Sequence, residues 1–443
     1  SFDIFAVPDT VPASTGGTFS GAIAAAGYSS STAGTSNYIA GVNAGNSITA
    51  GGNYNVTVGD EAGTAITTGD SNTAVGFEAL ATEDTASRNT AIGFRSLKTN
   101  NGGDNNTAVG ENSGTAVTTG HNNTLIGQDA GEALTDADYN TALGSDALQS
   151  DTLGSKSTAV GAAALSTQNF TSATDSHNTA VGYEAGKAVT TGQYNTLVGS
   201  LTGDAMTTGE NNVAMGQDAL TTNVAGDNVV AIGNEAAQLL NPSGNVDMNG
   251  VYIGYQAGDE VTTGRHNTVI GALTANALTT GSNNLLLGTT AGNADQPGGS
   301  ISTGGGQIVL GNASSTNAHI QIDWTVASDE RDKTDFTALD LGLDFVKELE
   351  PVTYKWDKRA KYGNDISTIT HDGTHKEDWL DVGFKAQAVE VLEKAAGYKI
   401  ADKTNLTTSL TDDGKQYGLQ YSKFVPILVK ALQELSEKND ALE

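Results

Sequence analysis

Apolar and polar positions alternate in a pattern that repeats along most of the chain. A segment of the form Asn-Thr-Ala-Val-Gly recurs, and its closing glycines are 17 residues apart from Gly59 to Gly161. Further copies continue the series to Gly311, with three longer steps of 21, 21 and 23 residues. Alternation with period two inside each segment predicts a short strand, and polar turns separate the copies. Each repeat is therefore expected to form one coil of a mainly β, stacked solenoid.

Three positions of the repeat have distinct expected roles. The residue before the closing glycine is apolar in every copy, as at Val75 and Ile92, and we expect this stripe to point inward. Asn stands four residues before the glycine in eleven copies, and stacked amides predict a hydrogen-bonded ladder between coils. The glycine of each Thr-Thr-Gly turn, such as Gly120, predicts a positive φ.

Composition divides the chain near residue 327. Residues 1–327 hold six Lys or Arg and 28 Asp or Glu, a net −22, whereas residues 328–443 hold 16 and 23, a net −7. The overall charge of −29 argues against a nucleic-acid partner, which needs a basic face. The chain has no run of 18 apolar residues, so no membrane-spanning helix is predicted. The absence of Cys excludes disulfides and thiolate metal sites.

The repeats contain few large side chains, since aromatic residues make up only 6% of the chain. One coil with a single regular apolar position buries little surface alone, so stacking is required. We therefore expect several chains to share one core.

The pattern N-T-A-V-G-x-E-A-L-x-x-x-T-T-G resembles the head repeats of trimeric autotransporter adhesins and similar repeats in phage tail fibres. The resemblance implies a left-handed β-roll in which three chains surround one axis. On this basis residues 1–40 are expected to form an N-terminal segment, residues 41–311 the repeat β-roll, and residues 312–327 a connector.

The region after the connector carries candidate chemistry. Ser328 and Lys333 are five residues apart, with Arg331 between them. A Ser–Lys pair can act as nucleophile and base when the lysine is desolvated or set beside another cation. The spacing is also what a solvated, charged segment at the start of a domain would have.

Several motifs in residues 328–443 resemble the intramolecular chaperone domain of phage tailspikes and tail fibres. They are S-D-x-R-x-K at 328–333, PVTYKWD at 351–357, GFKAQAVEVL at 383–392 and YGLQYSKFVPILVKALQELSEK at 417–438. The resemblance implies a small α+β domain that trimerises, guides folding of the preceding fibre and then cuts the Ala327–Ser328 bond.

That resemblance also implies a role for each motif residue. Ser328 would be the nucleophile and Lys333 the general base, while Asp329 and Arg331 would position the segment. The reaction would be a single autocatalytic turnover, with no diffusible substrate, cofactor or metal.

The last segment, about residues 420–443, predicts a helix. Ile427, Leu428, Ala431, Leu432 and Leu435 follow the 3 and 4 spacing of an apolar seam. A trimeric coiled coil is expected, and packing of the helix on its own domain is the alternative.

Other residue patterns allow weaker hypotheses. Acidic residues recur two after the glycine, as at Glu61 and Glu78, and could bind Ca²⁺ or form a glycosidase pair, or simply solvate the edge. His371 and His375 have a spacing found in metal sites, although Gly373 argues against a helix there. Aromatic residues after the glycine could stack on sugars or cover coil edges: Phe77, Phe94, Tyr183 and Tyr255.

The sequence as a whole predicts a homotrimeric phage tail fibre or tailspike. It would face outward from the virion, contact other tail proteins and bind a host-surface glycan or protein. A cellular trimeric adhesin is one alternative, and it would need a signal peptide and a membrane anchor that we do not find in this chain. A polysaccharide depolymerase is the other, and it would need paired acids in a groove.

Overall fold

The structure is a computed structural model, and its fold is mainly β. A parallel β-solenoid of about 15 turns is followed by a small α+β region, which confirms the expected fold class. The chain divides into two compact units, Ser1–Asp227 with Gly244–Val246, and Asn228–Ser243 with Asp247–Glu443. The structure describes residues 34–293, 299–321, 324–362 and 370–442.

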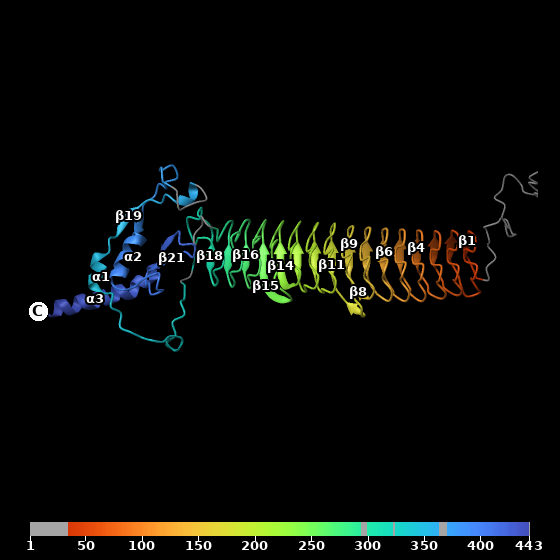
Figure 1. Ribbon diagram of the computed structural model, residues 1–443, viewed down its shortest axis with the longest axis horizontal. Coiled ribbons are helices and arrows are strands. Elements are labelled where there is room, and N and C mark those ends of the chain that lie inside the picture. The colour runs from red at the N-terminus through yellow and green to blue at the C-terminus, as the bar shows by residue number, and fades with distance from the viewer. Residues whose placement is uncertain (1–33, 294–298, 322–323, 363–369, 443) are drawn as a thin grey trace, which may run out of the picture. The chain divides into compact units, whose positions relative to one another are not determined.

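Most solenoid strands are only three residues long, and they follow one another in chain order within one sheet (Figure 1). The sheet strands are β1 (Tyr38–Ala40), β2 (Val56–Val58), β3 (Thr73–Val75), β4 (Thr90–Ile92), β5 (Thr107–Val109), β6 (Thr124–Ile126), β7 (Thr141–Leu143), β9 (Thr158–Val160), β11 (Thr179–Val181), β12 (Thr196–Val198), β13 (Val213–Met215), β14 (Gly226–Ile232), β15 (Val246–Ile253), β16 (Thr268–Ile270), β17 (Leu285–Leu287) and β18 (Ile308–Leu310). A separate pair, β8 (Gly154–Ser155) and β10 (Thr174–Asp175), lies at the first long repeat.

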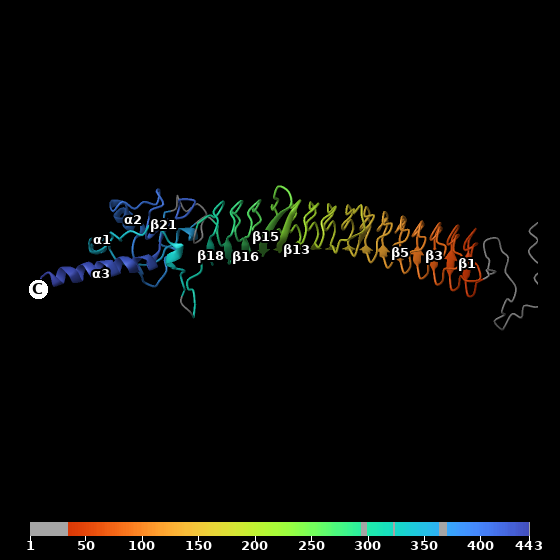
Figure 2. The same cartoon turned by 90° about the horizontal axis from the view of Figure 1, so that it is seen from below.

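Residues 17 apart lie in register on neighbouring coils, so one repeat is one coil as predicted. Between β3 and β4, for example, Ala74 pairs with Ala91 and Val75 with Ile92 in a parallel ladder. Seen after a 90° turn, the strand arrows of the first unit lie along one side of the coils (Figure 2). Because β1 begins at Tyr38, the coils start slightly before the expected boundary at residue 41.

The residue that points inward is not the one predicted. The middle residue of each three-residue strand of the solenoid sheet is buried, as at Ala74, Ala91 and Ala108. The residue before the glycine lies on the outer face: Ile92 is 40% exposed and Leu143 is 45% exposed. The prediction of an inward stripe before the glycine is wrong, because alternation in a three-residue strand turns the first and third residues outward together.

Each coil nevertheless has an apolar interior of its own. Fully buried side chains lie four residues after the glycine, as at Leu80 and Leu97, and seven residues after it, as at Val117 and Leu134. The chain therefore fills its own interior. Some of the apolar residues that stay exposed, such as Ile92 and Leu143, lie on the outer strand face.

The closing glycines are required by both conformation and space. Gly110 has a φ of +138°, and a Cβ there would lie 2.3 Å from the carbonyl oxygen of Gly127 in the next coil. The prediction of a positive φ at the Thr-Thr-Gly glycines is wrong. Gly120 has no such φ, and glycine is needed because a Cβ would lie 2.4 Å from the carbonyl oxygen of Ala137.

The predicted asparagine ladder is present, and its bonds run mainly from amide to backbone. The Oδ1 atom of Asn106 accepts a 2.9 Å hydrogen bond from the backbone N–H of Asn123, one coil on. Its Nδ2 atom donates to the carbonyl oxygen of Gly120 at 2.8 Å. The same two bonds recur at Asn72 and Asn89. Each fully buried amide therefore joins its coil to the next one.

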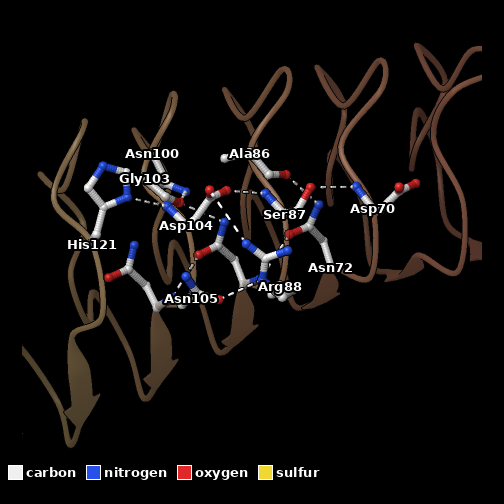
Figure 3. A network of polar contacts seen from close by, with 12 residues as sticks. Asp70, Asn72, Ala86, Ser87, Arg88, Asn100, Gly103, Asp104, Asn105 and His121 are labelled. Atoms are coloured by element: carbon white, nitrogen blue, oxygen red, sulfur yellow. Dashed lines mark hydrogen bonds and ion pairs between the residues drawn. The ribbon is translucent and has the colours of Figure 1, made fainter.

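A second ladder, which the sequence analysis missed, runs beside the first (Figure 3). Here the residue six before the glycine donates its backbone N–H to the side chain at the same position of the next coil. Asp70 donates to Ser87 Oγ at 3.0 Å, Ser87 to Asp104 Oδ1 at 2.6 Å, and Asp104 to His121 Nδ1 at 2.9 Å. The donor is a backbone N–H in every case, so side chains as different as Ser, Asp and His can serve as the acceptor.

The C-terminal region consists of helices of different lengths and two antiparallel strand pairs, β19 with β20 and β21 with β22. Its core is made by Leu341, Phe345, Val389, Phe424 and Ile427. The elements are η1 (Glu330–Asp332), α1 (Leu343–Glu348), β19 (Val352–Tyr354), η2 (Arg359–Lys361), β20 (Asp381–Gly383), α2 (Ala386–Ala395), β21 (Thr408–Leu410), β22 (Tyr417–Leu419), η3 (Tyr421–Lys423) and α3 (Phe424–Asp440).

The predicted seam of the last helix splits into two faces. Ile427 and Ala431 are buried in the domain, so this part of the seam packs on its own chain. Leu428, Leu432 and Leu435 are 49–68% exposed on the other face. The helix therefore presents a second apolar face that no described part of the chain covers.

Candidate functional site

The segment that carries the predicted dyad folds as one tight turn. Asp329 caps the short helix η1 by accepting a 2.9 Å hydrogen bond from the backbone N–H of Arg331. The same carboxylate holds the Arg331 guanidinium, with Nη2 2.6 Å from Oδ2. This partner lowers the pKa of Asp329 below its usual value. The ion pair thus closes the turn between residues 328 and 333.

The turn brings the two predicted catalytic side chains together. Lys333 Nζ donates to Ser328 Oγ at 2.5 Å and lies 3.3 Å from the Ser328 carbonyl oxygen. A nucleophile and a base need this kind of hydrogen-bonded approach. Ala327, whose carbonyl would be attacked, is the preceding residue and is exposed.

The dyad lies on the surface of the single chain. Ser328, Lys333 and the residues between them are all exposed. A lysine acts as a base only in its neutral form, which burial or a nearby cation favours. The single chain therefore brings Ser328 and Lys333 into contact but leaves the Lys333 amine exposed to solvent.

A buried carboxylate that the sequence did not indicate joins α2 to the start of β21. Glu393 on α2 accepts hydrogen bonds from the backbone N–H groups and the hydroxyls of both Thr407 and Thr408. Burial alone would raise the pKa of Glu393, but these four donors bring it below its usual value. Its donors come from 14 and 15 residues further along the chain, which no local motif indicates.

The histidine pair packs around an aromatic ring. His371 and His375 both contact Tyr362 edge-on, with ring centroids 5.7 and 4.7 Å away. His371 Nδ1 also lies 3.5 Å from Asp357 Oδ2. Within the described residues, no group of three or more His, Asp or Glu could hold a metal ion, and residues 363–369 lie outside that part.

The acidic and aromatic positions of the repeats lie at the coil surface. Glu78 binds both Arg95 and Lys98, at 2.8 and 2.7 Å. The Phe77 and Phe94 rings stack with centroids 5.6 Å apart, and both remain about two-fifths exposed. Tyr183 and Tyr255 are about half exposed. These rings cover neighbouring coil edges and keep surface available for a ligand.

Comparison with protein families gives a match at this site. Residues 328–398 match the family Peptidase_S74, described as chaperone of endosialidase, and the match begins at Ser328. Neither the curated proteins nor the solved structures yielded a match. The family match and the β-solenoid together support a protein of the tail fibre or tailspike type. No helix in the described ranges is long and apolar enough to cross a membrane.

Proposed function

We propose that this chain is a homotrimeric tail fibre or tailspike whose C-terminal domain is a self-cleaving intramolecular chaperone. The hydrogen bond between Lys333 Nζ and Ser328 Oγ carries the proposal, because it joins a nucleophile to a base at the first residue of the family match. The bond to be cut lies directly before the nucleophile, between Ala327 and Ser328.

The reaction proceeds in two steps. Neutral Lys333 takes the hydroxyl proton of Ser328 while Oγ attacks the Ala327 carbonyl carbon. The C–N bond to Ser328 then breaks, its nitrogen takes up the proton, and an ester links Ala327 to Ser328 Oγ. Water hydrolyses this ester, giving a carboxylate on Ala327 and restoring the Ser328 hydroxyl. Because nucleophile and target share one chain, high effective molarity favours a single turnover.

Cleavage is tested on a denaturing gel. The wild-type chain should shift from 45.1 kDa to two shorter fragments after folding, with a new N-terminus at Ser328. Ser328→Ala and Lys333→Met should stay full length, whereas the exposed control Thr337→Ala should cleave. A wild-type chain that stays at 45.1 kDa under folding conditions would contradict the proposed cleavage.

Two uncovered apolar surfaces support trimerisation. The outer strand face carries an apolar residue before every closing glycine, and all fifteen are half-buried or exposed. The outer face of α3 adds Leu428, Leu432 and Leu435. An apolar stripe that remains accessible to solvent is the kind of surface that interaction sites use. Copies of the same chain offer the matching repeat and register.

Light scattering tests the trimer, which should have three times the mass of the chain. Lysines at Ile92 and Leu143 would bring like charges together along the shared face and should lower the mass to that of a monomer. The control Gln128→Lys adds a charge at an exposed position that is not one of the fifteen stripe residues and should keep the trimer. A monomer mass for the intact wild-type chain would refute the proposal.

The proposed role in the virion is attachment to a host-surface glycan, or to a surface protein, with the base of the fibre joined to other tail proteins. The exposed rings of Phe77, Phe94, Tyr183 and Tyr255 support a saccharide ligand, because aromatic faces stack on sugar rings. A glycan array with the trimer should show binding that falls when Tyr183 and Tyr255 become Ala. Release of oligosaccharide from host polysaccharide would favour the depolymerase alternative. If the trimer binds no glycan on the array, the proposal of a glycan ligand is wrong.

A further inference from the structure

One column of the solenoid interior breaks its own pattern. From Gly59 to Gly271, the residue seven after the closing glycine is fully buried, and it is apolar in most of these coils. Glu83 and Asp151 occupy this column as fully buried acids. The apolar members are Ile66, Val117, Leu134, Val189, Met206, Leu240, Val261 and Leu278.

The first acid is paired with an amide in the next coil. Glu83 Oε2 accepts a 2.5 Å hydrogen bond from Asn100 Nδ2, which stands at the same column position 17 residues on. Glu83 Oε1 accepts from the backbone N–H of Ala86 at 2.5 Å, within its own coil. Asn100 also donates to the carbonyl oxygen of Gly103 at 2.9 Å. The carboxylate is thus satisfied only when these two coils are neighbours.

The second acid repeats the arrangement. Asp151 Oδ2 accepts from Gln168 Nε2 at 2.6 Å, again 17 residues on and in the same column. Its Oδ1 accepts from the backbone N–H of Gly154 at 3.0 Å. In both pairs the acid precedes the amide. Two independent occurrences of one order and one spacing indicate a common role.

The repeats create the problem that such pairs would solve. The closing glycine, the buried asparagine and the three-residue strand recur with the same spacing, so a coil can make these contacts with almost any other coil. Misassembly by one repeat is a characteristic failure of repeat proteins. If the coil of Asn100 were skipped, Glu83 would face Val117 and lose its amide donor. A buried carboxylate without a partner is strongly disfavoured.

We propose that the two buried acid–amide pairs, Glu83–Asn100 and Asp151–Gln168, fix the register in which the near-identical coils stack. They act by making the wrong neighbour costly, as buried polar groups do when they set the register of coiled coils. Burial raises the pKa of both acids, and their hydrogen-bond donors act in the opposite direction.

Stability measurements separate this role from simple stabilisation. Asn100→Leu leaves Glu83 buried without its amide and should lower the melting temperature by several degrees. The double variant Glu83→Leu/Asn100→Leu makes the column apolar and should melt at or above the wild-type temperature. If Asn100→Leu melts like the wild type, Glu83 does not depend on its amide and the proposal fails.

Disulfide cross-linking measures the register of the coils directly. The chain has no native Cys, so only the introduced cysteines can form a disulfide. Cysteines at Ala81 and Thr115 occupy equivalent positions two coils apart, roughly 10 Å, which is beyond disulfide reach. They become neighbours only when the coil between them is skipped. Cysteines at Ala81 and Lys98 report the native register. Oxidation with oxidised glutathione during refolding of the full chain, followed by mass spectrometry, measures both products.

The 81–115 product should be near background with the wild-type column and rise severalfold with the double leucine variant. A second variant, Asn100→Val/Val117→Asn, moves the amide one coil on and should raise it further. Exchanging Val117 and Leu134 keeps the column apolar at those coils and should leave the product at background. If neither the double leucine variant nor Asn100→Val/Val117→Asn raises the 81–115 product, the acid–amide pairs do not set register.

Discussion

Asn106 is the best position at which to measure what the asparagine ladder contributes. It is fully buried, and truncation to Ala removes three hydrogen bonds to the next coil, two of them to backbone groups. The N–H of Asn123 and the carbonyl of Gly120 would both lose these partners inside the coil stack. A buried backbone group without a partner costs about 1–3 kcal/mol. Asn106→Ala should therefore lower the free energy of unfolding by about 2–6 kcal/mol.

Asn106→Asp distinguishes the two bonds. One carboxylate oxygen can still accept from the Asn123 N–H, but the other now faces the Gly120 carbonyl oxygen, which offers no proton. The buried charge adds its own cost, so Asp should destabilise at least as much as Ala near neutral pH. Acidification protonates the carboxyl and provides a donor for Gly120. The Asp variant should therefore regain stability as the pH falls, and the Ala variant should not.

Urea unfolding followed by far-UV circular dichroism measures both effects. The matched control is Gln128→Ala, which removes an exposed amide and should change stability by less than about 0.5 kcal/mol. Slopes of the transitions must be compared as well, because stacked repeats can unfold in segments. The reasoning is refuted if Asn106→Ala and Gln128→Ala unfold alike, or if acid fails to rescue Asn106→Asp.

Three further predictions follow from single contacts. Burial raises the pKa of Glu83 to about 7 from 4.5, so the folded chain keeps a proton that the unfolded chain releases. Stability should be full below about pH 4.5 and fall by about 3 kcal/mol as the pH rises through 7, and Glu83→Gln should abolish that slope in urea unfolding. Gly110→Ala should cost more than about 3 kcal/mol, seen as a lower melting temperature, because a Cβ there meets the Gly127 carbonyl at a φ open only to glycine; a melting temperature equal to the wild type would contradict this. Asp329→Ala should slow cleavage at Ala327 without changing the melting temperature, because the turn that joins Ser328 to Lys333 loses its cap; timed gels measure it, and an unchanged rate would argue against a positioning role.

The repeat period predicted the coils and one ladder correctly because both depend only on spacing. A 17-residue step places Asn72 over Asn89 whatever the coil geometry is. The direction of each side chain was harder, because a strand of three residues offers only one inward position. Ile92 and Leu143 were predicted to be buried because they are large and apolar. The position that is actually buried, one residue earlier, is often occupied by Ala. The sequence did not show which position of the strand faces inward, so a prediction based on side-chain size was wrong.

The site was predictable to the extent that it is local. Ser328 and Lys333 are five residues apart, and a capped turn brings their side chains within hydrogen-bond distance. Glu393 and the Glu83–Asn100 pair could not be inferred in this way. Their partners lie 14 to 17 residues away, and the meaning of that distance depends on which residues face inward.

The glycine columns have a consequence for how such a chain can evolve. Because a coil meets its neighbour through the same backbone approach at positions such as Gly93 and Gly110, one whole repeat can be removed or duplicated and the new neighbours still fit. Near-identical repeats also recombine readily in the gene, so the number of coils can change by single repeats, whereas a partial repeat would misalign every column. The coils that carry Glu83 and Asp151 are exceptions. On the register proposal, a deletion that separates Glu83 from Asn100, or Asp151 from Gln168, should be tolerated less well than the removal of any other single repeat.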